Sequence, residues 1–169
     1  VYQHEIDDHK KDPSNPVENI RLWPGNGDTS LGEPKILAPF VDVNNNGLYE
    51  PKLGDYPKIK GAIAAYCIYN DNGIHTESGG KPFGFEIHQM FYQESEGANN
   101  GLFDETNLAY FRLINRSSNS YKDVKFGLFV DFDLGDFDDD MIGCDSITNM
   151  GFVYNGKPND EGILGYGLN

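Results

Sequence analysis

The stretch from Ala38 to Pro57, APFVDVNNNGLYEPKLGDYP, constrains the fold more than any other part of the chain. Within it Asp42, Asn44 and Asn46 alternate with other residues and are followed directly by Gly47. A Ca²⁺ ion binds about six to eight oxygen atoms, and a tight loop of alternating Asp and Asn brings several of them to one point. The glycine allows the backbone to turn. The stretch therefore predicts a calcium-binding loop.

The match to the EF-hand calcium loop covers only the beginning of that motif. Residues 42–47 fit the pattern D-x-[DN]-x-[DN]-G, but Leu53 stands where the closing glutamate is expected. Asp55 is the expected substitute, and Pro51 argues against a helix that continues out of the loop. The predicted ligands of this first site are Asp42, Asn44, Asn46, the carbonyl of Leu48, and Asp55. The alternative is an Asx-rich turn without metal, since Asn and Asp hydrogen-bond their own backbone in turns.

A second acidic stretch, DFDLGDFDDDMIGCD, covers residues 131–145 and holds seven aspartates. So many like charges repel one another unless a cation lies among them. We therefore expect a second calcium site. Its preferred ligands are Asp131, Asp133, Asp139 and Asp145, with Asp136, Asp138 and Asp140 as further candidates. A solvated acidic loop is the alternative.

Length and charge limit the classes of partner. The chain has 169 residues, enough for one domain with a core, and a formal net charge of −14. Nucleic acids and anionic membrane surfaces would be repelled by that charge. No apolar run reaches the roughly 18 residues that membrane insertion requires. Calcium ions are the expected partners, with glycans or other surface proteins as further partners.

Short alternating segments predict an all-β chain. No stretch shows an apolar helical stripe with caps, and the clearest alternation is that of Val124, Phe126, Leu128, Val130 and Phe132. The other predicted strands are 62–70, 83–92, 107–115 and 150–155. We expect an antiparallel β-sandwich or jelly-roll-like domain with long calcium-binding loops over residues 38–169. Residues 1–37 are expected to form an extended N-terminal arm.

Trp23 is the single tryptophan and lies in the polar N-terminal part. We expect it to attach the arm to the domain, because a large aromatic side chain gains most from burial. A solvent-facing Trp23 that stacks on carbohydrate is the alternative.

Two further groups of residues could carry chemistry. Asp71, His75, Glu86 and His88 could form a transition-metal or acid/base site, but a histidine on a strand more commonly has a hydrogen-bonded structural role. Cys67 and Cys144 could form a disulfide, but we expect each to lie in or beside the core as a small hydrophobic residue. No motif of nucleophilic catalysis or phosphate binding is present.

Several phrases of the sequence resemble a known family. They are APFVDVNNNGLYEPKLGDYP, NDNGIHTESGGKPFGFEIH, FGLFVDFDLGDFDDDMIGCD and MGFVYNG, in this order. They are similar to a module of large secreted proteins of Bacteroidota that carry a C-terminal sorting domain for type IX secretion. The resemblance implies an extracellular or cell-surface location, no established enzymatic activity, and further protein on both sides of this segment. The family usually has Asp where this chain has Asn46, which implies a weaker first site.

These observations together predict a calcium-stabilised extracellular module with a structural or adhesive role, and not an enzyme. Two alternatives remain open. One is a secreted polysaccharide hydrolase that uses the face of Asp71, His75, Glu86 and His88. The other is a carbohydrate-binding module that uses Trp23 and surface tyrosines.

Overall fold

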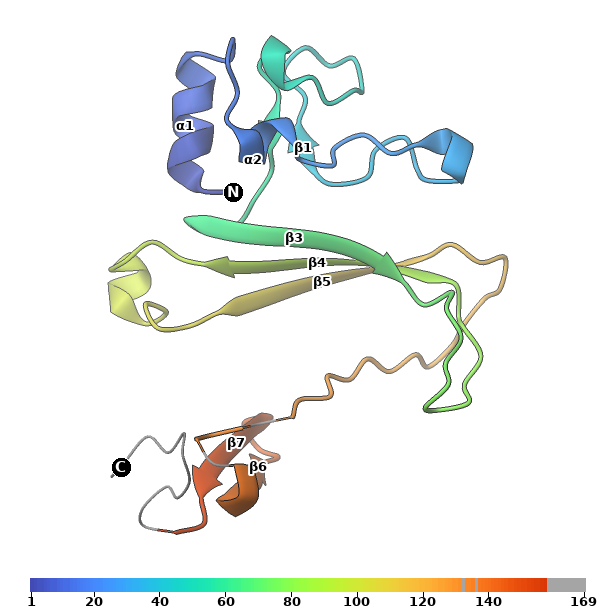
Figure 1. The fold of residues 1–169 in the computed structure, drawn as a ribbon, viewed down its shortest axis with the longest axis vertical. Helices are drawn as coiled ribbons and strands as arrows, with labels where there is room; N and C mark the ends of the chain where they lie inside the picture. The colour runs from blue at the N-terminus through green and yellow to red at the C-terminus, as the bar shows by residue number, and fades with distance from the viewer. Residues whose placement is uncertain (132, 136, 158–169) are drawn as a thin grey trace. The chain divides into compact units, whose positions relative to one another are not determined.

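The computed structural model describes residues 1–131, 133–135 and 137–157 (Figure 1). The contacts divide the chain into two compact units, Val1–Asn119 and Ser120–Asn169, so the division falls later than the expected boundary after residue 37. Most of the regular structure is strand in antiparallel sheets, with little helix. The expected all-β character is thereby confirmed.

The first unit is built on a three-stranded antiparallel sheet. Its strands are β3 (Ile63–Asn70), β4 (Phe85–Gln93) and β5 (Leu108–Asn115), in the order β3-β4-β5. The register places His88 opposite Ile68 on β3 and opposite Arg112 on β5. All three strands coincide with predicted ones to within two residues.

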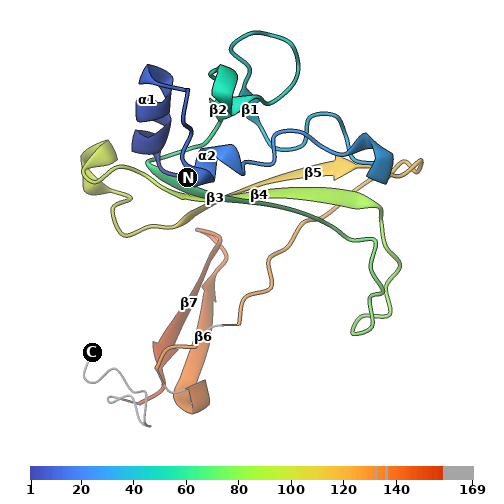
Figure 2. The same cartoon turned by 45° about the horizontal axis from the view of Figure 1, so that its top comes forward.

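The two faces of this sheet differ in burial. On the inner face Ala64, His88 and Met90 are almost fully buried. On the outer face Tyr69 and Phe91 are exposed, although the sequence pattern predicts the face of Phe91 to be the apolar, buried one. The reason is that the N-terminal residues cover the other face, as both views show (Figures 1 and 2).

The N-terminal residues are not an extended arm. They form α1 (Gln3–Lys11), α2 (Glu18–Arg21) and the 3-10 turn η1 (Thr29–Leu31). Helix α1 escapes a search for an apolar stripe because its buried positions are Ile6 and the polar His9. It is stabilised instead by charges, since Glu5 accepts the N–H of Tyr2 at the first turn and basic residues end the helix.

Trp23 attaches this N-terminal part to the sheet, as predicted. Its side chain is 7% exposed, its ring lies 5.2 Å from that of Tyr66 on β3, and its Nε1 donates to the carbonyl oxygen of Pro39 at 3.0 Å. Together with Ala38 and Tyr49 it forms the buried core of the unit. Trp23 is therefore not a surface platform for carbohydrate, and that alternative is wrong for this residue.

The first acidic stretch lies between two short paired strands. These are β1 (Phe40–Val41) and β2 (Tyr56–Pro57), with Phe40 opposite Pro57, and the 3-10 turn η2 (Pro51–Leu53) lies between them. A further 3-10 turn, η3 (Ala98–Gly101), joins β4 to β5. The β1–β2 pairing fixes both ends of the predicted calcium loop, so the loop is held as a closed unit.

The second unit contains the hairpin of β6 (Asp140–Asp145) and β7 (Met150–Asn155), preceded by the 3-10 turn η4 (Phe137–Asp139). Strand β7 was predicted, whereas β6 lies in the expected acidic loop. The predicted strand at 124–132 is wrong for residues 124–131, which have no regular structure, and Phe132 lies outside the described residues. Alternation favours a strand, but a strand also needs a partner for its backbone, and no described residue pairs with this segment.

Both cysteines are free and exposed, so the expectation of a place in or beside the core is wrong. Cys67 shares the outer face of β3 with Ala65 and Tyr69, because alternate residues of a strand point to the same side. In the part of the chain that the structure describes, no helix has the length and apolar character needed to cross a membrane.

Candidate functional site

The Asp42 turn folds its polar side chains back onto its own backbone. The carboxylate of Asp42 accepts the N–H of Gly47 at 2.6 Å through Oδ2 and that of Asn46 at 3.2 Å through Oδ1. Asn44 Oδ1 accepts the same Asn46 N–H at 3.1 Å, and Asn46 Oδ1 accepts the N–H of Leu48 at 2.8 Å. Gly47 has a φ of 75°, in the left-handed region where glycine is favoured. Asp42, Asn44 and Asn46, three of the predicted side-chain ligands of the first site, therefore belong to one tight turn.

The side chain of Asp55 closes the loop by bonding to backbone on both sides of the turn. Its side chain is fully buried, with Oδ1 accepting the N–H of Val43 at 2.8 Å and Oδ2 accepting that of Glu50 at 2.7 Å. A buried carboxylate requires such partners, because its charge has left water. Asp55 thus holds the first and last parts of the loop together, a role that the sequence alone did not predict for it.

The side chains of the loop carry the kind of oxygen atom that hard cations bind. A carboxylate oxygen has two acceptor positions, and each oxygen of Asp42 uses one of them for a backbone N–H. Glu50 joins the set, since Asn46 Nδ2 donates to its Oε2. Of the predicted ligands, Asp42, Asn44, Asn46 and the carbonyl of Leu48 would hold the ion, together with Glu50. The predicted ligand Asp55 is fully buried and holds the loop closed through the N–H groups of Val43 and Glu50. Glu50 was not among the predicted ligands, although a carboxylate only four residues after Asn46 in the sequence could have indicated that it belongs to the same loop.

The second acidic stretch is divided by the hairpin. Asp131 and Asp133 are exposed in irregular structure, Asp139 ends η4, and Asp145 ends β6. A strand rises about 3.4 Å per residue, so the two ends of β6 are about 17 Å apart. Asp139 and Asp145 therefore lie at opposite ends of the strand, and the four preferred ligands do not form one site.

Asp145 has local partners of its own. It accepts the N–H of Ile147 and the hydroxyl of Thr148, each at 2.8 Å, and these bonds hold the pKa of Asp145 below its ordinary value. It therefore acts as a turn residue of the β6–β7 hairpin. Asp138 lies in η4 and Asp136 lies outside the described residues.

The start of the hairpin has buried oxygens that lack a donor. Asp140 and Asn155 are cross-strand partners, and Oδ1 of each is buried with no hydrogen-bond partner among the described residues. The other oxygen, Asp140 Oδ2, accepts the N–H of Leu134 at 2.8 Å. Buried acceptors without a donor are costly, and a bound cation is one way in which such oxygens are satisfied. Asp140 is thus a better supported ligand than Asp145, and Asn155 is a residue that sequence reasoning missed.

Within the described ranges, no group of three or more His, Cys, Asp or Glu side chains is placed to hold a metal ion. The predicted first site contains two such side chains, Asp42 and Asp55. Its remaining oxygens come from the amides of Asn44 and Asn46 and from a backbone carbonyl.

Glu86 and His88 form a closed network on the inner face of the sheet. His88 Nε2 lies 2.7 Å from Glu86 Oε1, and because a carboxylate only accepts, Nε2 carries the hydrogen. His88 Nδ1 contacts the hydroxyl of Tyr66, and Arg116 Nη2 donates to the same Glu86 oxygen at 2.7 Å. The bond from Arg116, followed by that from His88, lowers the pKa of Glu86 despite partial burial, while burial raises the pKa of Tyr66 to about 12.

His75 and Asp71 contact each other in a different way. His75 Nε2 lies 2.9 Å from the carbonyl oxygen of Asp71, and the Asp71 carboxylate accepts the N–H groups of Phe83 and Phe85. Burial raises the pKa of Asp71, but these backbone bonds outweigh it and the pKa is lowered. The four residues considered as a catalytic face thus have structural partners, and among the described residues no hydrogen bond joins the Asp71–His75 pair to the Glu86–His88 pair.

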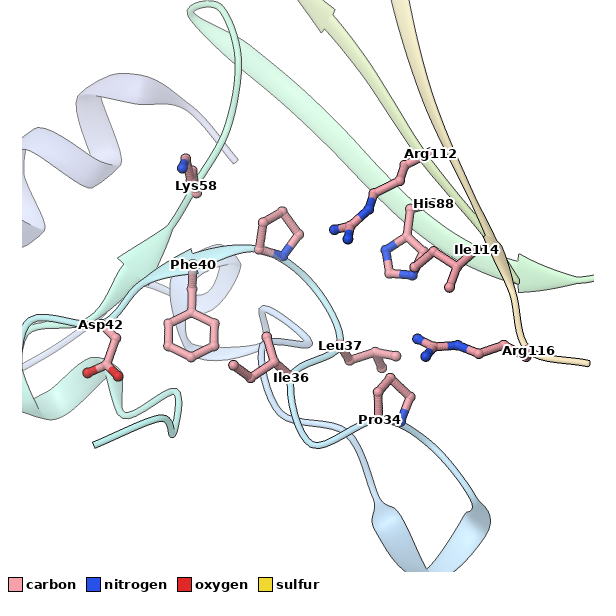
Figure 3. Close-up of a pocket in the computed structure, with 11 residues that line it drawn as sticks. Pro34, Ile36, Leu37, Phe40, Asp42, Lys58, His88, Arg112, Ile114 and Arg116 are labelled. Carbon is pink, nitrogen blue, oxygen red and sulfur yellow. The ribbon is translucent and has the colours of Figure 1, made fainter. Parts of the chain in front are cut away.

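A pocket of about 500 Å³ opens between the inner face of the sheet and residues 34–42 (Figure 3). Arg112, Arg116 and Lys58 contribute positive charges to its lining, and His88 lies in its wall. The sequence gives no direct signal for this pocket, since its residues come from distant segments.

Comparison with protein-family models, curated proteins and solved structures gives no match to this chain.

Proposed function

We propose that this chain is a calcium-stabilised module with a structural or adhesive role in a secreted or cell-surface protein. The observation that carries the proposal is the closed Asp42 turn, in which Asp42, Asn44 and Asn46 present oxygens from one short segment. The buried Asp55 carboxylate holds this segment closed. Calcium chemistry needs an array of hard oxygen ligands of this kind.

The charge of the chain supports the same proposal. A net charge of −14 destabilises a compact state through self-repulsion, and cations bound at the densest acidic positions reduce that repulsion. A second ion at Asp140 and Asn155 is supported by their buried, donor-free oxygens. Calcium would therefore act on both units of the chain.

We also propose that the module is a two-layer β-sandwich, and the exposed outer face of the sheet supports this. Tyr69 and Phe91 are exposed there, together with Leu113 on β5. An antiparallel sheet commonly covers one apolar face with a second layer. The resemblance to secreted Bacteroidota proteins supports the extracellular location and export by type IX secretion. An adhesive role would give the module glycans or other surface proteins as partners.

Calcium removal tests the proposal. A ligand that binds only the folded state stabilises it by about 4 kcal/mol at a thousandfold excess over its Kd. Thermal unfolding with calcium and after chelation should therefore differ by many degrees, and magnesium should restore little of the loss because it requires a smaller octahedral shell. Identical melting curves before and after thorough chelation would reject the proposal.

Variants assign the ions to the two loops. Calorimetric titration of Asp42→Ala should lose one class of calcium site, and Asp140→Ala should lose the other. Asp12→Ala is the matched control, because the Asp12 carboxylate likewise accepts a nearby backbone N–H, that of Ser14, but has no predicted metal role. If Asp42→Ala binds calcium as Asp12→Ala does, the Asp42 segment is only a turn.

A further inference from the structure

The pocket of the first unit has an apolar side and a cationic side. Ile36, Leu37 and Phe40 lie along one side in the segment that leads into β1. Arg112 and Arg116 extend toward them from the region of β5, as the close-up shows (Figure 3). The volume of about 500 Å³ lies in the range of small-molecule sites.

The two arginines have different partners. Arg116 donates to Glu86 at 2.7 Å, so its charge is compensated. Arg112 is exposed and forms no ion pair with any carboxylate in the described part of the chain. Lys58, at another part of the lining, likewise has no acidic partner there. The pocket thus offers free positive charge in a chain whose net charge is −14.

The wall behind Arg112 contains a buried, hydrogen-bonded histidine. His88 lies directly opposite Arg112 in the sheet register and is 3% exposed. Both of its ring nitrogens have partners, in Glu86 and Tyr66, so it supports the pocket and does not offer a free donor. The only carboxylate in the described lining is Asp42, and both of its oxygens accept backbone N–H groups of its own turn.

We propose that this pocket binds a small organic carboxylate with an apolar body. The guanidinium of Arg112 would take the carboxylate, because its planar N–H groups match the two oxygens of that group. The apolar body would lie against Ile36, Leu37 and Phe40. The binding does not depend on the calcium-module proposal, since none of these contacts uses a metal ion.

Calorimetric titration with 4-phenylbutyrate and with its neutral amide, 4-phenylbutyramide, tests the inference on the full chain. The carboxylate should bind with a millimolar Kd or tighter, and the amide about tenfold or more weakly, because it lacks the charge-assisted bond. Arg112→Gln should weaken carboxylate binding about tenfold or more. Arg21→Gln is the matched control, since it removes the same charge from an exposed residue outside the pocket and should leave binding unchanged.

A second variant and a chelator complete the test. Ile36→Glu places a negative charge on the apolar side and should also weaken carboxylate binding about tenfold or more, while Ile36 is exposed enough for the fold to survive. A calcium ion in the Asp42 turn could itself attract a carboxylate, so the titration is repeated with a chelator present. The affinity should be the same, because Arg112 and not a metal ion binds the carboxylate. Absence of binding, equal binding of the amide, equal effects of Arg112→Gln and Arg21→Gln, or loss of binding with chelator would each overturn the inference.

Discussion

His9 on α1 is hydrogen-bonded to the backbone of Asp55, with 3.0 Å between its Nε2 and the carbonyl oxygen. A carbonyl only accepts, so Nε2 carries the hydrogen. Both residues are buried, at 4% and 0% exposure. The bond therefore ties the N-terminal helix to the residue that closes the acidic loop, over a separation of 46 positions in the sequence.

Replacing His9 by alanine should lower the free energy of unfolding by about 1–3 kcal/mol, because the Asp55 carbonyl loses its imidazole donor in a buried place. His4→Ala is the control, since His4 is exposed on the same helix. Chemical denaturation of the three proteins measures the effect. Equal stabilities for the two variants would show that the His9 bond does not hold the helix in place.

The carboxylate of Asp55 can be tested by Asp55→Asn, which keeps the shape but replaces one accepting oxygen by a donor. One of the N–H groups of Val43 and Glu50 would then face another donor. We expect a loss of about 1–3 kcal/mol in chelator, together with weaker calcium binding by calorimetry. Asp12→Asn should change neither quantity. If Asp55→Asn keeps the stability of the parent in chelator, the Asp55 carboxylate does not close the loop.

Glu86 should make stability depend on pH in acid. Its pKa is lowered from an ordinary 4.5, first by the bond from Arg116, so the folded state favours the ionised form. Its contribution is complete above pH 4.5 and is lost as the pH falls through the lower folded pKa. Glu86→Gln should therefore be less stable than the parent by about 1–3 kcal/mol at pH 7, with a difference that shrinks below about pH 4.5.

Urea denaturation across that pH range measures the difference. Glu77→Gln, at an exposed glutamate of the β3–β4 connection, should match the parent throughout. The Glu86→Gln prediction fails if its stability deficit stays constant down to strongly acidic pH. Screening the parent against polysaccharide and protein substrates adds a second check. We expect no turnover by the parent, because we propose a structural and not a catalytic role for Glu86.

Gly25 should not tolerate a side chain. A Cβ at this buried position would lie 2.5 Å from Cβ of Tyr49 and 3.1 Å from Cδ1 of Phe40. Gly25→Ala should therefore destabilise the protein by about 1–3 kcal/mol through overpacking. Gly73→Ala is the control, since nothing lies within 4 Å of its Cβ position. Comparable melting temperatures for the two variants would mean that the core around Tyr49 has room to adjust.

Four of the longer strands could be predicted because they are local patterns, three in the sheet of the first unit and one in the hairpin of the second. Residues 63–70, 85–93, 108–115 and 150–155 have strand-forming composition and turns at their ends, and each finds a partner. The segment at 124–131 has the clearest alternation but no partner in the described chain, so pairing and not pattern decides the outcome. Helix α1 was missed because its buried face consists of Ile6 and His9, which is too polar for an apolar stripe.

The sequence by itself determined the Asp42 turn, because Asx side chains and a following glycine act on their own neighbouring backbone and need no distant partner. It also determined that Trp23 would be buried, through the size of its apolar surface. Only the tertiary structure decided which face of the sheet is covered, what closes the loop, and that Arg112 and Leu37 line the same pocket. These depend on contacts between segments far apart in the chain, and a one-dimensional pattern does not contain them.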